Sequence, residues 1–138
     1  MGSTGSIGLQ TLDIVARYPE RFKVATLVAH HNWQKLAEQA RRFSADSVVI
    51  GDKRHYAALK EALSDTTIEV MAGSDAITQV ARSYRSDTIV NALVGYAGLH
   101  PTAAAIESGK RIALANKESL VVGGDIIMEA ARRKSVEI

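Results

Sequence analysis

The segment Gly2–Gly8 (GSTGSIG) contains the residue types that bind phosphate groups. Its glycines recur at every third position, which removes Cβ atoms where a backbone must turn sharply and approach a ligand closely. A helical pattern begins at Ser6, and the unpaired N–H groups of a helix N-terminus attract anions. The segment departs from the common G-x-G-x-x-G spacing, however, and a flexible leader before an ordinary helix would contain the same residues.

The next polar turn, Ala29–Asn32, bears on which dinucleotide such a segment would bind. A site for NAD usually has Asp or Glu about 20 residues after the glycines, where the carboxylate binds the ribose hydroxyls. The turn here reads Ala-His-His-Asn, so it brings no carboxylate that would repel a 2′-phosphate. His31 and Asn32 can donate hydrogen bonds to that phosphate, which favours NADP over NAD. Both histidines also fit a plain solvent-exposed loop.

A third polar turn, Asn116–Ser119, follows an apolar run near the end of the chain. Lys117 could meet an anionic substrate, and Asn116 and Glu118 could form hydrogen bonds to ribose or amide groups. The alternative is that Asn116 and Ser119 only cap the following helix.

Short strands and amphipathic helices must position these turns. Strands are predicted at 22–29, 47–50, 68–72, 88–94 and 111–115, mostly without polar alternation, as is typical of parallel strands buried on both faces. Helices are predicted at 6–18, 33–40, 56–63, 77–84, 101–109 and 120–133, with a further strand opening at 136. This order predicts an α/β fold with a doubly wound, Rossmann-like, mostly parallel sheet and helices on both faces. Ligands of such sheets bind beyond the carboxyl ends of the strands.

Composition excludes several other classes of function. Among 138 residues the net charge is only +2 and the basic residues are dispersed, so we expect no nucleic-acid partner. No apolar run approaches the roughly 20 residues that cross a bilayer, and cysteine is absent, which together favour a cytoplasmic protein without a membrane partner. The four histidines are not spaced as a metal-binding set, so we expect no metal site within the chain.

The motifs GSTGSIG, VGYAGLHPT and ALANKESLV together resemble the 1-deoxy-D-xylulose 5-phosphate reductoisomerase family, and the resemblance spans essentially the whole chain. Members of that family convert 1-deoxy-D-xylulose 5-phosphate to 2-C-methyl-D-erythritol 4-phosphate in isoprenoid biosynthesis, the MEP pathway. They use NADPH and Mg²⁺ or Mn²⁺. The resemblance therefore implies an NADP-dependent oxidoreductase with a small phosphosugar substrate, and a homodimer when full length.

The resemblance also assigns roles to individual residues. It implies NADPH diphosphate contacts at Thr4, Gly5, Ser6 and Ile7, adenosine-phosphate contacts at His31 and Asn32, and further NADPH contacts at Asn116 and Glu118. Lys117 matches the family's substrate-binding lysine. Where this chain has His30 and His31, the family often has a small residue followed by Lys or Arg. The grip on the 2′-phosphate is therefore expected to be weaker here and to depend on pH.

The family pattern extends beyond both ends of the chain. It places a short strand before the glycine turn and an Asp-x-Glu metal motif a few residues after Ile138. We therefore expect residues 1–138 to form one NADPH-binding Rossmann-like domain truncated at both ends, lacking its first strand and the catalytic, metal-binding domain. Such a chain should be marginally stable and show no turnover alone. The alternatives are a noncatalytic NADPH-binding module and a domain of a different NADP-dependent dehydrogenase.

Overall fold

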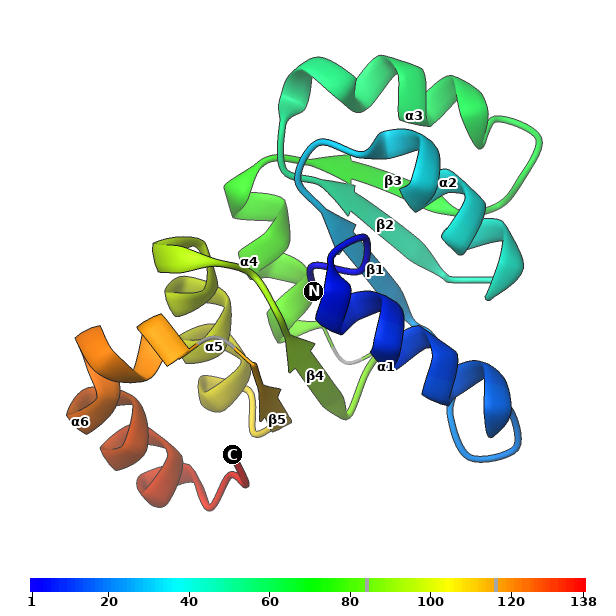
Figure 1. The fold of residues 1–138 in the computed structure, drawn as a ribbon. Coiled ribbons are helices and arrows are strands. Elements are labelled where there is room, and N and C mark those ends of the chain that lie inside the picture. Colours follow the sequence, from blue (N-terminus) through cyan, green and yellow to red (C-terminus); the bar gives the residue numbers. More distant parts are fainter. Residues whose placement is uncertain (84, 116) are drawn as a thin grey trace. The chain divides into compact units, whose positions relative to one another are not determined.

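The computed structural model describes residues 1–83, 85–115 and 117–138, so the expectations for Tyr84 and Asn116 lie outside the described residues. The chain divides into two compact units, Met1–Ile77 and Thr78–Ile138 (Figure 1). Helix α4 (Ser74–Arg82) runs from the first unit into the second. None of the described helices is long and apolar enough to cross a bilayer.

The first unit contains a three-stranded parallel sheet in the order β1-β2-β3. Along the chain its elements are α1 (Ser6–Arg17), β1 (Thr26–Ala29), α2 (Trp33–Arg42), β2 (Ser47–Ile50), the short 3₁₀ helix η1 (Lys53–His55), α3 (Tyr56–Ala62) and β3 (Glu69–Ala72). The last residues of the three strands, Ala29, Ile50 and Ala72, are in register. The loops that follow the strands therefore leave the sheet at one common edge.

The core of the first unit explains why these segments fold as they do. All four residues of β2 are buried, as expected for a central parallel strand that is covered on both faces. The apolar stripes of α2 and α3 contribute buried residues to the same cluster as one face of the sheet, and Leu12 adds a contact from α1. That cluster includes Leu27, Ala29, Leu36, Ala40, Val48, Ile50, Leu59, Leu63 and Val70.

The second unit pairs two strands in parallel and packs helices beside them. Its elements are β4 (Thr88–Asn91), the 3₁₀ helix η2 (Gly95–Gly98), α5 (Leu99–Glu107), β5 (Arg111–Leu114) and α6 (Lys117–Lys134). Ile89, Ala105, Ile106 and Ile127 are buried. The backbone of α6 departs from helical geometry at Gly123, where an added Cβ would lie 3.1 Å from Leu99 Cδ1.

The predicted α/β alternation and parallel pairing are confirmed, but several boundaries differ, most clearly those of three predicted strands. The strand expected at 22–29 is regular only from Thr26, and the strand expected at 88–94 ends at Asn91. The strand expected to open at Val136 does not form a regular strand, although Ile112 N donates a 2.9 Å hydrogen bond to Glu137 O. In each of these three segments the apolar run is longer than the stretch of backbone that is paired with a neighbouring strand.

Candidate functional site

The glycine turn is fastened to the carboxyl end of β1. The amides of Gly2 and Ser3 both donate 2.8 Å hydrogen bonds to Val28 O, one residue before β1 ends. Gln39 of α2 adds an anchor, because its Nε2 donates a 2.9 Å hydrogen bond to Ser3 O. A polar residue within the apolar stripe of α2 was the sequence signal for this contact, and our sequence reasoning missed it. The turn therefore opens at the sheet edge where ligands of parallel sheets bind.

Gly8 allows this turn to lie directly against the helix that follows it. A Cβ at Gly8 would approach Gly2 O to 2.2 Å and Ser3 Cα to 2.6 Å, and both of these are backbone atoms that cannot rotate away. A Cβ at Gly5, by contrast, would meet Gly2 O at an ordinary 3.5 Å. The two glycines therefore serve different purposes: Gly8 is required by packing within the chain, whereas Gly5 leaves open space at the helix end.

The first turn of α1 presents unused hydrogen-bond donors. Within the described part of the chain, the amides of Thr4, Ser6, Ile7 and Gly8 donate no hydrogen bond, and Gly5 at the N-cap offers no side-chain cap. Gly5, Ser6 and Ile7 are exposed. The hydroxyl of Ser3 is buried and has no partner among the described residues. Several uncommitted donors at one helix N-terminus provide the geometry that binds a phosphate group.

His31 and Asn32 leave the same edge of the sheet. Asn32 caps α2, since its Oδ1 accepts a 3.0 Å hydrogen bond from the amide of Lys35. The turn is joined to the one after β2, because Gly51 N donates to Ala29 O and Asp52 N donates to His30 O. His30 lies against Gly51, where a Cβ would meet its Nδ1 at 2.4 Å. The exposed His31 therefore lies in a turn that is hydrogen-bonded to the turn after β2.

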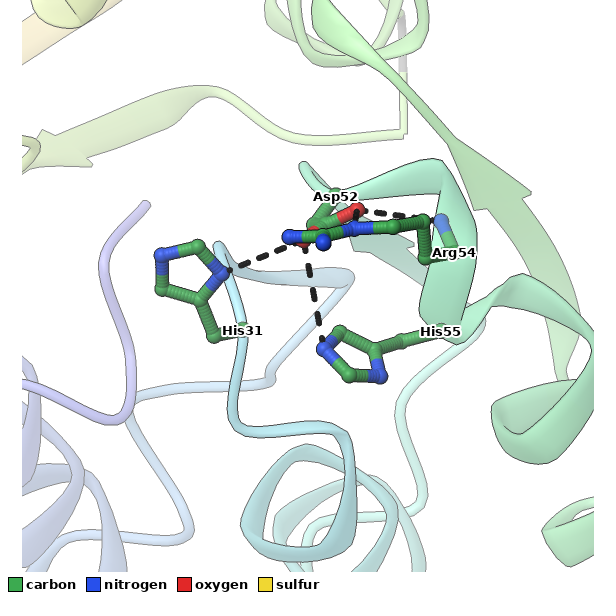
Figure 2. Close-up of polar contacts among 4 residues, drawn as sticks. All are labelled: His31, Asp52, Arg54 and His55. Atoms are coloured by element: carbon green, nitrogen blue, oxygen red, sulfur yellow. Dashed lines mark hydrogen bonds and ion pairs between the residues drawn. The ribbon is translucent and has the colours of Figure 1, made fainter.

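The turn after β1 contains no carboxylate, but the carboxylate of Asp52, in the turn after β2, lies beside His31. Its Oδ2 lies 3.4 Å from His31 Nδ1 and 4.0 Å from His55 Nε2, as Figure 2 shows. Arg54 holds the same carboxylate through a 2.6 Å contact from its Nη2. Hydrogen bonds from the Arg54 side chain, and then from its amide, hold the pKa of Asp52 well below its usual range. Our sequence reasoning did not connect Asp52 with His31, because the two residues lie 21 positions apart in the sequence.

In the second unit, Lys117 and Glu118 begin α6, and Lys117 is the third residue after the end of β5 at Leu114. Lys117 is exposed and Glu118 is half-buried. Asn116, the third residue predicted for this turn, lies outside the described residues. The structure therefore places Lys117 and Glu118 at the carboxyl end of a parallel strand, where the sequence pattern predicted them.

A buried asparagine, which our sequence reasoning did not single out, shapes the neighbouring loop. Asn91 ends β4 and is fully buried, and its Nδ2 donates to Gly98 O at 2.9 Å and to Thr102 Oγ1 at 2.8 Å. Its Oδ1 accepts a hydrogen bond from the amide of Leu93. The loop thus leaves Val94 and Tyr96 exposed, with 85% and 71% of their surfaces accessible. Asn91 therefore stabilises the loop that contains the VGYAGLHPT motif.

A family model for 1-deoxy-D-xylulose 5-phosphate reductoisomerase matches residues 1–124. The chain belongs to this family. Curated reductoisomerases from Bacteroides fragilis and Burkholderia multivorans are 49% and 53% identical to it, each over 96% of the chain. The alignment covers only 34% of each relative, so the chain spans about a third of the length of the curated relatives it matches.

Solved reductoisomerases confirm the Rossmann-like fold class. The Zymomonas mobilis reductoisomerase in complex with NADPH superposes with a TM-score of 0.95 at 43% identity, covering 99% of this chain and 36% of that one. A second reductoisomerase, in complex with NADPH, fosmidomycin and magnesium, superposes with a TM-score of 0.93 at 36% identity and covers 98% of this chain and 33% of that one. Both of these solved relatives are reductoisomerases with NADPH bound.

The described residues fit NADPH better than they fit the magnesium of these relatives. Unused helix amides suit a diphosphate, whereas Mg²⁺ requires a near-octahedral set of oxygen ligands. Among the described residues, the one group of three or more histidines and carboxylates that could hold an ion is His31, Asp52 and His55. Two of its three donors are imidazole nitrogens. This donor set does not suit magnesium, and we derive no role for magnesium from this chain.

Proposed function

We propose that this chain is the NADPH-binding part of a reductoisomerase that converts 1-deoxy-D-xylulose 5-phosphate to 2-C-methyl-D-erythritol 4-phosphate. The observation that carries the proposal is the set of uncommitted amides at Thr4, Ser6, Ile7 and Gly8, at the head of a helix fastened to the sheet edge. NADPH supplies the hydride for the reduction when it is bound. The role of the chain itself is to bind the phosphate groups of NADPH and to orient the cofactor.

The individual contacts are proposed from the family resemblance, together with the positions of the described residues. Thr4, Ser6 and Ile7 bind the diphosphate with backbone N–H groups, and the side chains of Thr4 and Ser6 add hydroxyl donors. Gly5, whose amide donates to Gly2 O, contacts the diphosphate through its backbone, which no Cβ shields. His31 and Asn32 bind the adenosine phosphate from the neighbouring turn. Asn116 and Glu118 form further hydrogen bonds to NADPH, and the exposed ammonium of Lys117 binds the phosphosugar substrate.

Preference for NADPH over NADH depends on the balance of charge around Asp52. Its carboxylate would repel a 2′-phosphate if it stood alone, but Arg54 lies against it and His31 faces the same oxygen. The cluster therefore presents one negative and one positive charge, which offset each other. This arrangement tolerates a 2′-phosphate, to which His31 can donate a hydrogen bond.

Fluorescence titration of NADPH and NADH into the chain tests this function. We expect NADPH to bind at least about tenfold more tightly, since one charge-assisted hydrogen bond to the 2′-phosphate contributes about 1.5–3 kcal/mol. The variant His31→Ala should reduce the ratio of the NADPH affinity to the NADH affinity. His100→Ala, which removes an exposed histidine of α5, should leave this ratio unchanged. Failure of the wild-type chain to bind either nucleotide would contradict the proposal.

The remaining properties of the complete enzyme are proposals that rest on the family. They comprise a requirement for Mg²⁺ or Mn²⁺ whose ligands lie outside this chain, a homodimeric state and a cytoplasmic location. We expect the chain alone to oxidise no NADPH when it is mixed with 1-deoxy-D-xylulose 5-phosphate and Mg²⁺. Turnover in that assay would show that the chain holds a complete catalytic site. A noncatalytic module would instead bind NADPH within a full-length protein that is inactive on this substrate.

A further inference from the structure

Three side chains that are far apart in the sequence converge at the carboxyl edge of the first sheet. His31 follows β1, while Asp52 caps η1 after β2 and His55 is the last residue of η1 (Figure 2). The nearest nitrogens of both imidazoles face one oxygen, Asp52 Oδ2, at 3.4 Å and 4.0 Å. All three ligand atoms lie within 4.8 Å of one another. Spacing along the sequence suggested no metal-binding set of histidines, but the parallel register of β1 and β2 brings two of them together.

The chemistry of these donors selects a class of ion. Two imidazole nitrogens and one carboxylate oxygen suit Zn²⁺ and neighbouring transition metals, which bind such atoms at about 2.0–2.2 Å. Donors that share one such ion lie roughly 3.3 Å apart, which the separation of His31 Nδ1 from Asp52 Oδ2 already matches. The other separations need a small rotation of the imidazoles. The side chains of His31 and His55 are 65% and 36% exposed, so both are free to make that rotation.

Arg54 fixes the carboxylate through both of its oxygens. Its amide and its Nε each donate a 3.0 Å hydrogen bond to Asp52 Oδ1, while its Nη2 and its Nε lie 2.6 Å and 3.1 Å from Oδ2. A carboxylate has about four acceptor sites and Arg54 supplies three N–H groups, so one site is left for an ion that also binds the imidazoles. The side chain of Asp52 is only 11% exposed, which leaves the ligand held in place. Such outer-shell contacts commonly orient the ligands of metal sites.

We propose that His31, Asp52 and His55 form a binding site for a transition-metal ion of the Zn²⁺ class, with water completing the coordination. The site stands on the geometry of the two turns and does not depend on the proposed reaction. It shares His31 with the proposed adenosine-phosphate contact. Bound Zn²⁺ and NADPH should therefore compete for the chain, and the metal would regulate access of the cofactor.

Calorimetric titration of ZnCl₂ into the chain without nucleotide tests the site. We expect one binding event whose affinity falls at least tenfold in His31→Ala and in His55→Ala, because each removes one of only three protein ligands. His100→Ala is the matched control and should bind Zn²⁺ as the wild type does. Co²⁺ should give visible absorption bands that His55→Ala abolishes. Absence of Zn²⁺ binding, or equal binding by His55→Ala and the wild type, would overturn the proposal.

The same variants separate this site from the proposed cofactor function. His55→Ala should lose Zn²⁺ but keep its affinity for NADPH, because His55 is not among the proposed cofactor contacts. Zn²⁺ should raise the apparent Kd of NADPH for the wild type and leave that of His55→Ala unchanged. Tight Zn²⁺ binding by a chain that binds no nucleotide would sustain the metal site and refute the cofactor function. NADPH binding by a chain that binds no Zn²⁺ would support the cofactor function and refute the metal site.

Discussion

At the residue scale, Gly5 and Gly8 should respond differently to the same added methyl group. In Gly5→Ala the new Cβ meets only Gly2 O at 3.5 Å, and the φ angle of −82° suits alanine, so stability should change by less than about 0.5 kcal/mol. The methyl group would, however, fill the space beside the uncommitted amides. We expect NADPH affinity to fall at least about tenfold, as measured by fluorescence titration alongside thermal denaturation.

Gly8→Ala is the contrasting variant. Its Cβ would meet backbone atoms at 2.2 Å and 2.6 Å, so the glycine turn would have to move away from the helix. Both the melting temperature and NADPH binding should then fall together. If Gly5→Ala bound NADPH as tightly as the wild type, the first turn of α1 would not be the diphosphate site.

Individual residues also show what the sequence could and could not predict. Thr4–Ile7 were predicted from one contiguous motif, because a glycine turn and the helix that follows it are local features. The contact between His31 and Asp52 was missed, since it depends on Ala29 pairing in register with Ile50. The sequence of either turn alone does not determine which residues of β1 and β2 are paired. The same limit hid Gln39, whose partner Ser3 lies 36 positions away.

At the element scale, one ion pair joins α2 to the end of α3 and should make the first unit sensitive to acid. Arg41 Nη2 lies 2.5 Å from Asp65 Oδ1 and 2.6 Å from Ala62 O. The hydrogen bond from Arg41 lowers the pKa of Asp65, so its stabilisation is fully present above the ordinary value near 4 and disappears as the pH falls through the lowered pKa. The wild type should melt at a higher temperature than Asp65→Asn at pH 6, and this difference should shrink below pH 4. A difference that stayed constant from pH 6 to pH 2 would show that the ion pair is not its cause.

The loop between β4 and α5 should depend on Asn91. The variant Asn91→Ala removes the donor for Gly98 O and Thr102 Oγ1 in a fully buried position, which should cost about 2 kcal/mol in the free energy of unfolding. Urea denaturation measures this cost. Ser108→Ala, which removes the hydroxyl of an exposed residue that follows α5 and is bonded to Ala104 O, should cost less than about 0.5 kcal/mol. Equal costs for the two variants would contradict the bracing role of Asn91.

The bounds of a strand were predicted well only where the strand pairing and the apolar run end at the same residue. Ser47–Ile50 was predicted with the observed bounds, because this buried run is paired on both sides along its whole length. The strand predicted over 88–94 is shorter because its pairing with β5 ends at Asn91, which is in register with Leu114, and the Asn91 side chain holds the loop that follows. The sequence there remains apolar, so hydrophobicity alone could not mark the end of the strand.

At the scale of the whole molecule, cofactor binding should stabilise the chain by mass action. A ligand at one hundred times its Kd adds about 2.7 kcal/mol to the stability of the state that binds it. We expect NADPH to slow amide hydrogen exchange in α1, β1 and the turn at His31, all within the first unit. Adenosine 2′,5′-bisphosphate, which lacks the nicotinamide half, should protect the turn at His31 but leave the start of α6 at Glu118 unprotected. NADPH should protect both places, and protection of α6 alone would refute the diphosphate site at the glycine turn.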